Sequence, residues 1–321
     1  MVKRPDSYCS VASETNRKSL RLPYMVRSEL KLCVAIFLTL LCTTSLYPQE
    51  PYSPGDAQEL VREVVANELE ALQTDRSRWR FVSRAQQPGI DQTKDVIETN
   101  EGALTRLIAE RGEPLTPEQQ RNQDQRLAQF IRNPSQMKRQ KQEQERDKQR
   151  LQKLLALLPD GFLYQHNWDE GGNVGLSFRP NPGFRPPNRD AQVFHAMEGT
   201  MIVDRRAKRL KEFRGRLERD VVFGWGILGR LHRGGVFEVC QNEVAAGHWE
   251  LTLLDIQVTG KALFFKTVGQ QQHEERSDFH EVPADLTPAE AVEMLKQELP
   301  HSSNAGRRRT PACAVCAGVE C

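Results

Sequence analysis

The sequence predicts an α+β protein that is built on one large antiparallel β-sheet. Residues 193–282 contain six runs of β-type residues with short turns between them, a pattern typical of strands joined by hairpins. Ser53-Pro54 and Thr287-Pro288 predict helix starts, because each combines a capping side chain with proline at the first helical position. The two predicted helices flank the strands. Residues 119–153, rich in Gln, Arg, Lys and Glu, predict a charged helical arm.

The charge of the chain gives no general case for nucleic-acid binding. The 321 residues carry 45 basic and 43 acidic side chains, a net charge of +2. Residues 1–45 hold seven of the basic residues and three of the acidic ones, so the remainder is nearly neutral. Proteins that bind nucleic acid through surface charge usually carry a basic excess. We therefore expect no nucleic acid among the partners.

Residues 1–45 have the pattern of a secretory signal region. Basic residues precede the apolar run 32–42, and small residues follow it up to Ser45. The run is short for a membrane span. We expect a true start at Met25, cleavage after Ser45 and export to the periplasm; the alternative is a buried N-terminal helix.

The patterns divide the chain into five parts. These are the signal region (1–45), the N-terminal helix with the first strands (46–115), a charged helical insertion (116–160), the main antiparallel sheet with a C-terminal helix (161–299) and a disordered tail (300–321).

The cysteines predict no metal site. They are Cys9, Cys33, Cys42, Cys240, Cys313, Cys316 and Cys321. Leu41 is too large for a lipoprotein signal that ends at Cys42. Cys240 lies within a predicted strand, where a free cysteine is typically a small buried hydrophobe. Cys313-x-x-Cys316 has no second pair, so we expect a local disulfide in an oxidising compartment.

The N-terminal part predicts an amphipathic helix and three strands. From Ser53 to Leu72, apolar residues recur at helical spacing with charged residues between them. Residues 79–83 and 95–99 are β-type, and Asn100-Glu101-Gly102 predicts a hairpin turn into a third strand, residues 103–109.

The charged insertion predicts helix. Thr116-Pro117-Glu118-Gln119 has the spacing of a capping box, Pro134 interrupts the helix, and Pro159-Asp160-Gly161 stops it. Residues 118–153 carry ten basic and five acidic side chains, which leaves two interpretations open. The arm binds anionic phospholipid or nucleic acid, or it is a solvated helix with paired charges. The lack of interleaved aromatic residues in 138–153 favours the solvated helix.

The main sheet begins with two strands, residues 162–164 and 174–178. A proline-rich connector, residues 179–187, follows and cannot be a central strand. The next predicted strand covers residues 193–204, with Gly199 as a bulge or bend.

The later strands differ in how their apolar residues are distributed. Residues 211–221 alternate between apolar and charged side chains, which predicts a strand with one solvent-exposed face. Residues 236–244, 249–258 and 262–268 carry apolar side chains on both faces, so both faces need cover. We expect a helix to cover one face and the other to line a cavity. Residues 276–282 predict a closing edge strand.

A glycine-rich stretch lies between two of these strands. Gly224, Gly226 and Gly229 match the spacing of a dinucleotide fingerprint, but only about one turn of helix could follow before Gly234-Gly235. We interpret the stretch as an apolar flap. The seven scattered histidines form no i, i+4 pair, and no nucleophile motif is present. We therefore predict a protein that is not an enzyme and that uses no cofactor or metal.

Three segments carry a resemblance to a known family. Residues 176–182 (LSFRPNP), 199–204 (GTMIVD) and 222–229 (VFGWGILG), together with the signal region and the N-terminal helix, resemble the envelope proteins related to LolA, the periplasmic carrier of lipoproteins. The resemblance covers roughly residues 160–285. It implies an antiparallel sheet curved into an incomplete barrel, covered by helices, whose apolar interior holds acyl chains. The charged insertion and the tail depart from the family pattern.

These observations give two functional expectations. The first is a periplasmic carrier for an apolar ligand, either lipid or an acylated protein, with peripheral membrane contact at most. The expected cavity and flap residues are Trp225, Ile227, Leu228, Leu231, Trp249, Leu251, Leu253 and Phe264. The second is an envelope scaffold with a solid core, whose basic arm contacts a protein partner or an anionic membrane.

Overall fold

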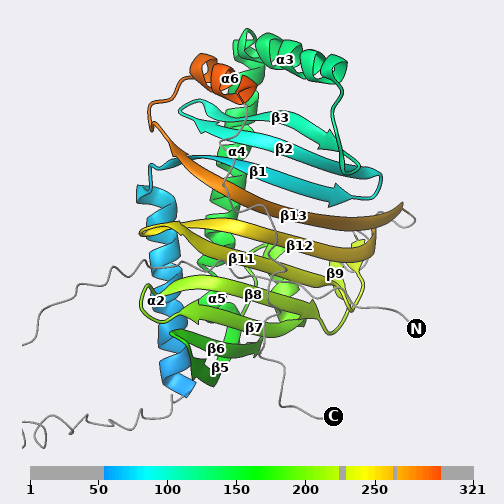
Figure 1. The fold of residues 1–321 in the computed structure, drawn as a ribbon. Helices are drawn as coiled ribbons and strands as arrows, with labels where there is room; N and C mark the ends of the chain where they lie inside the picture. The colour runs from blue at the N-terminus through cyan, green and yellow to red at the C-terminus, as the bar shows by residue number, and fades with distance from the viewer. Residues whose placement is uncertain (1–53, 224–228, 263–265, 298–321) are drawn as a thin grey trace, which may run out of the picture.

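The computed structural model describes residues 54–223, 229–262 and 266–297. They form an α+β structure around one antiparallel sheet of thirteen strands, which is not closed into a barrel. The sheet order is β4-β3-β2-β1-β13-β12-β11-β8-β7-β6-β5, and the hairpin of β9 and β10 extends it beside the end of β12 (Figure 1). The first strands therefore join the same sheet as the later ones.

The strands are β1 (Arg78–Gln87), β2 (Ile90–Thr99), β3 (Gly102–Glu110), β4 (Glu113–Pro114), β5 (Phe162–Glu170), β6 (Asn173–Pro180), β7 (Met197–Asp204), β8 (Arg209–Leu217), β9 (Val221–Phe223), β10 (Gly229–Leu231), β11 (Val236–Ala245), β12 (His248–Ala262) and β13 (Lys266–Val282). The helices are α2 (Pro54–Thr74), α3 (Pro117–Ile131), α4 (Pro134–Leu155), α5 (Leu158–Gly161), the 3-10 helix η1 (Asp190–Ala196) and α6 (Pro288–Lys296). None of these helices has an apolar stretch long enough to cross a membrane.

The larger core lies between α2 and one face of strands β5 to β8. Helix α2 buries Val61 and Val64 completely or nearly so, as its apolar periodicity predicts. Phe162 is fully buried at the centre, with its ring 4.7 Å from Phe178 and 4.9 Å from Phe194. We call this side of the sheet the α2 face.

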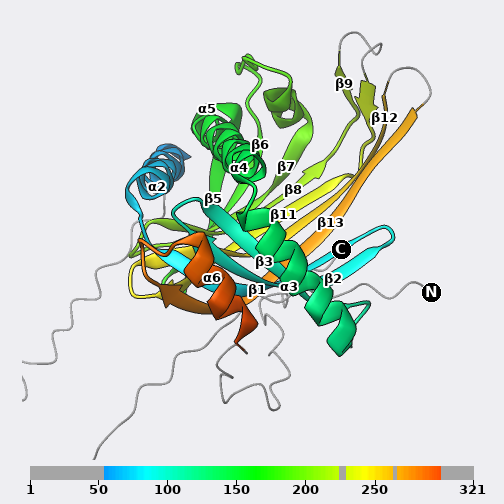
Figure 2. The same cartoon turned by 90° about the horizontal axis from the view of Figure 1, so that it is seen from above.

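Helices α3 and α6 pack on the opposite face of the sheet (Figure 2). Ile97 and Leu104, neighbours across β2 and β3, are buried there with Leu127 of α3 and Leu295 of α6. Each helix begins with a complete capping box, as its sequence predicts. The two helix groups therefore stabilise different halves of the sheet from opposite sides.

Helix α4 connects the two faces, and the expectation of a charged helical arm is not confirmed. No residue of α4 is fully buried. Its first half hydrogen-bonds the end of the β2–β3 hairpin, where Gln140 Nε2 donates to the carbonyl oxygen of Ala103 at 2.6 Å. At its other end, Leu154 and Leu155 pack against the larger core. The helix thus lies across the α2 face and is attached at both ends (Figure 1).

Several predicted elements need correction. Residues 193–196 belong to η1 and not to the strand predicted over 193–204. The predicted bulge at Gly199 is absent from β7, whose register shifts between Ile202 and Val203. The run 211–221 breaks into β8 and β9 after Leu217.

The predicted closing edge strand lies in the middle of the sheet. Residues 276–282 are part of β13, which pairs with β1 on one side and β12 on the other. The predicted strand 262–268 divides between the end of β12 at Ala262 and the start of β13 at Lys266. Helical structure also continues through Pro159-Asp160-Gly161 as α5, where the sequence predicted a stop.

Candidate functional site

The central strands carry a stripe of half-buried apolar side chains on the α2 face. Phe213 of β8, Val239 of β11 and Leu254 of β12 lie directly opposite one another, and so do Phe237 and Ile256 one step along. Residues opposite each other in a ladder point to the same face. The stripe lies on the α2 face because the Phe213 ring stacks on Phe178, with the ring centroids 4.7 Å apart. We call these five residues the apolar stripe.

The helices leave the apolar stripe partly uncovered. All five side chains are half-buried, whereas Phe162 and Leu176 in the neighbouring core are almost completely buried. Leu231 of β10 is also half-buried and packs at the border of that core. The partly covered surface thus extends from the central strands toward the β9–β10 hairpin.

A charged group borders the apolar stripe on the same face. Leu254 lies opposite Glu274 of β13. Glu274 Oε1 accepts hydrogen bonds from Arg276 Nε at 2.8 Å and from Ser83 Oγ at 3.1 Å. Burial raises the pKa of Glu274, but the positive charge of Arg276 and these hydrogen bonds outweigh it and lower the pKa below its ordinary value. Glu274 is therefore a fixed negative charge, and its partner Arg276 lies over the Phe81 ring, 5.2 Å from the centroid.

Two further carboxyl groups lie near Arg276, where α2 ends. The backbone N–H of Trp79 donates to Glu98 at 3.1 Å, yet burial raises the pKa of Glu98 above its ordinary value. Burial and the nearby charge of Glu98 raise the pKa of Glu250 to about 7, against a smaller opposing effect of Arg276. A carboxyl group with such a pKa changes charge near neutral pH, as groups at functional sites often do.

A pocket of about 540 Å³ opens beside these carboxyl groups. It is lined by Asp75 and Ser77 after α2, by Arg209 at the start of β8 and by His248 at the start of β12. Hydrogen bonds from Ser77, together with His248, lower the pKa of Asp75, although burial opposes them. His248 Nδ1 lies 3.4 Å from Asp75 Oδ2. The pocket thus has charged side chains in its wall, which the apolar stripe lacks.

The structure places the predicted site residues in different environments. Leu253 points to the face opposite the apolar stripe, because its neighbour in β11 is the buried Cys240. Trp249 is half-buried under Arg209, whose guanidinium carbon lies 5.7 Å from the ring centroid. Leu251 is half-buried beside Gln241. The predicted residues Trp225, Ile227, Leu228 and Phe264 lie outside the described residues.

Sequence reasoning missed the charged border of the site. Arg276 was predicted to lie in an edge strand and Glu274 was given no role, and their contacts Ser83 and Phe81 lie about 190 residues away in the chain. One signal was present: Glu274 and Arg276 are two residues apart in a β-type run, so they share one face. Their proximity to the apolar stripe depends on the pairing of β13 with β12, which no local pattern predicts.

The arrangement places an apolar surface next to fixed charges. No group of three His, Cys, Asp or Glu side chains among the described residues is placed to hold a metal ion. An apolar surface next to fixed charges can bind a molecule that has an apolar chain and a polar end. No family model, curated protein or solved structure matches the chain, so the resemblance to LolA-related proteins stays a prediction.

Proposed function

We propose that the protein is a non-catalytic carrier for a ligand with an apolar chain, either a lipid or the acyl group of an acylated protein. The apolar chain lies along the apolar stripe, and the polar end lies near Glu274 and Arg276. The observation that supports the proposal is the half-buried state of five apolar side chains on one face, directly beside this ion pair. In this proposal the open sheet acts as an incomplete barrel of the LolA-like kind, and the carrier works in the periplasm.

The energy of such binding follows from the apolar area that the ligand covers. Each buried methylene contributes about 0.8 kcal/mol, so a chain of eight methylenes contributes roughly 6 kcal/mol before losses. Association itself costs several kcal/mol in lost translational and rotational freedom, which reduces the net affinity. We therefore expect long-chain fatty acids to bind with dissociation constants in the micromolar range or weaker. The affinity should rise as the chain lengthens.

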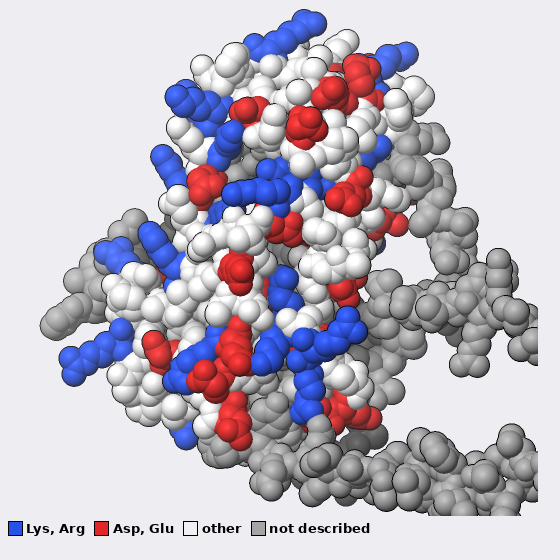
Figure 3. Space-filling view, turned by 90° about the vertical axis from the view of Figure 1, so that its left-hand side faces the viewer, with Lys and Arg blue, Asp and Glu red and all other residues white. Residues whose placement is uncertain are grey.

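The charges on the surface give less support to the scaffold alternative. In α4, two of the seven basic side chains are paired: Lys141 lies 3.3 Å from Glu101, and Arg150 forms a two-pronged pair with Asp190 at 2.8 and 2.9 Å. Basic and acidic side chains also alternate over the side of the molecule that Figure 3 shows. A surface that attracts an anionic membrane usually has clustered, unpaired basic residues.

Native mass spectrometry with lipid extraction tests the proposal on the purified full chain. We expect co-purifying lipid, or uptake of added palmitate in a near one-to-one ratio. Val239→Asp places a charge in the apolar stripe and should reduce palmitate binding more than tenfold. Ile90→Asp is the matched control, because Ile90 is 44% exposed and lies in β2, away from the apolar stripe.

Two results would contradict the proposal. The first is a protein without lipid that takes up no palmitate, which would favour the scaffold with a solid core. The second is equal palmitate binding by the Val239→Asp and Ile90→Asp variants. Val239→Phe serves as a second variant, because it fills space without adding charge; thermal unfolding shows whether each variant keeps its fold.

A further inference from the structure

Strand β3 forms one edge of the sheet and is covered only at its ends. Strand β4 pairs with Ala109 and Glu110, and the N–H of Leu115 donates to the carbonyl oxygen of Ile108 at 3.1 Å. At the other end, Ala103 is covered by α4: Gln140 Nε2 donates to its carbonyl oxygen at 2.6 Å, and its N–H donates to Gln144 Oε1 at 3.4 Å. The edge between these two covers is a window of a few residues.

The backbone groups inside this window point away from the sheet. In an antiparallel ladder, alternate residues direct both their N–H and their C=O toward the same neighbour. The bonds of Ala103 to α4 show that this residue points outward, so Thr105 does too; the register of β3 shifts only after Leu107. No hydrogen bond within the described part of the chain fills this outward side of Thr105. An open edge of this kind is a template for another strand.

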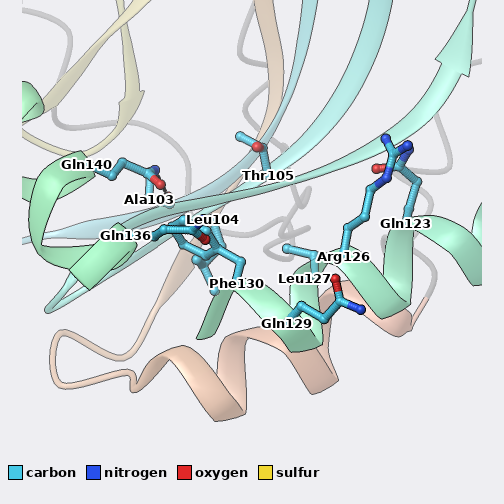
Figure 4. Close-up of a pocket in the computed structure, with 10 residues that line it drawn as sticks. All are labelled: Ala103, Leu104, Thr105, Gln123, Arg126, Leu127, Gln129, Phe130, Gln136 and Gln140. Carbon is cyan, nitrogen blue, oxygen red and sulfur yellow. Dashed lines mark hydrogen bonds between the residues drawn. The ribbon is translucent and has the colours of Figure 1, made fainter. Parts of the chain in front are cut away.

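A pocket of about 310 Å³ lies beside the window, between β3 and helices α3 and α4 (Figure 4). Leu104, Leu127 and Phe130 give it an apolar base. The amide side chains of Gln123 and Gln136 also line it. Glutamine amides both donate and accept hydrogen bonds, as peptide groups do. The pocket therefore combines space for a side chain with groups that match a peptide backbone.

The pocket carries a positive charge, which favours a ligand with a negative charge. Arg126 is the charged residue among the ten that line it, and its side chain is exposed. The nearby Arg106 is already paired, because its Nε lies 2.8 Å from Asp124 Oδ1. Arg126 has no ion-pair partner within the described chain. A carboxylate on a bound peptide would supply the missing partner.

We propose that the edge of β3 binds an extended, acidic peptide segment of a partner protein by β-strand addition. The segment hydrogen-bonds the outward N–H and C=O of Thr105, and an acidic side chain reaches Arg126. Strands rise about 3.4 Å per residue, so the window between the covered residues Ala103 and Ile108 accommodates about four peptide residues. This surface is separate from the apolar stripe and does not depend on the carrier function.

A labelled peptide tests the proposal on the full chain. The probe is a capped seven-residue peptide of alternating Thr and Val with Glu at its centre, and fluorescence anisotropy measures its affinity. Thr105→Pro removes the outward N–H and spares the β2–β3 ladder, since proline is tolerated where the N–H of an edge strand faces solvent. We expect at least a tenfold loss of affinity. Thr105→Val keeps the N–H and is the matched control.

The remaining comparisons separate backbone recognition from charge. N-methylation of alternate peptide residues removes donors without changing the protein, and should also weaken binding at least tenfold. Arg126→Gln should lower the affinity about fivefold for the Glu peptide and leave a Gln-centred peptide unchanged, whereas Arg121→Gln, on the same helix, should change neither.

Three results would overturn the proposal. They are no peptide binding at millimolar concentration, binding that Thr105→Pro and N-methylation leave intact, and self-association of the chain that Thr105→Pro abolishes. The last result would make a second copy the occupant of the edge.

Discussion

Replacing Glu250 by Gln should stabilise the protein at alkaline pH and leave its stability unchanged at acid pH. Burial and Glu98 raise the pKa of Glu250 from 4.5 to about 7 in the folded chain. A carboxyl group with a raised pKa binds its proton more tightly in the folded state than in the unfolded state. Its favourable contribution is complete below the unfolded pKa, and it is lost as the pH rises through the folded pKa. At pH 8 the wild-type protein therefore holds an unfavourable buried charge.

The size of the effect follows from the shift. Each pKa unit corresponds to about 1.4 kcal/mol, which gives roughly 3 kcal/mol for the full shift of Glu250. The side chain is only partly buried, so solvent screening reduces the expected gain to about 2 kcal/mol. Urea unfolding of both proteins from pH 4.5 to 8.5 measures the difference. It should grow from near zero to its full size between about pH 5 and 8.

The control is Glu110→Gln, which makes the same substitution at an exposed position at the end of β3. A constant difference between wild type and Glu250→Gln across this range would refute the reasoning. So would a variant that is less stable than wild type at pH 8, since that result would mean that the ionised carboxylate is stabilised by Arg276.

Three further predictions concern the packing of the sheet and the helix caps. Arg80→Met should lower the free energy of unfolding by about 3 to 5 kcal/mol, because it leaves Asp95 buried without its ion-pair partner, which lies at 2.7 Å. Adding Asp95→Leu should restore most of the loss. Urea unfolding of the single and double variants measures both effects. Gly199→Ala should cost about 2 kcal/mol or more, because its Cβ would lie 1.9 Å from the carbonyl oxygen of Arg214; a thermal midpoint equal to wild type would contradict this. Thr287→Ala should cost about 1 kcal/mol by removing the cap of α6, while Thr287→Ser should keep it, as measured by the same unfolding assay.

The elements that sequence reasoning placed correctly are those with local causes. Thr116 and Thr287 cap their helices through side chains within three residues, so the signal and the structure lie in the same short segment. The turn at Asn100 and Glu101 is likewise fixed by its own residues, together with Gly102, which has a positive φ of 113°. Helix α2 begins at Pro54, where the proline predicted the first helical position.

The elements that sequence reasoning misplaced depend on distant partners. Val193 and Phe194 are β-type residues, but they lie in η1 because Phe194 packs 4.9 Å from Phe162 in the larger core. Residues 276–282 were predicted to form an edge strand. They lie in the centre of the sheet since their strand pairs with β1 on one side and β12 on the other. Contacts between residues this far apart in the chain leave no periodic trace in the sequence.

The sequence predicted the two-sided apolar character of the strands that carry the candidate site, but not which residues form the site. Apolar residues at consecutive positions of β12 required cover on both faces, and the structure confirms the two-sided arrangement: Leu253 lies beside Cys240, and Leu254 lies beside Val239 on the other face. Helix α4 crosses the face that carries Leu254, but without a fully buried residue of its own. Folding of the described residues therefore leaves apolar surface partly in water beside Glu274. Covering it would contribute about 25 cal/mol per Å², and a ligand with an apolar chain can provide that cover.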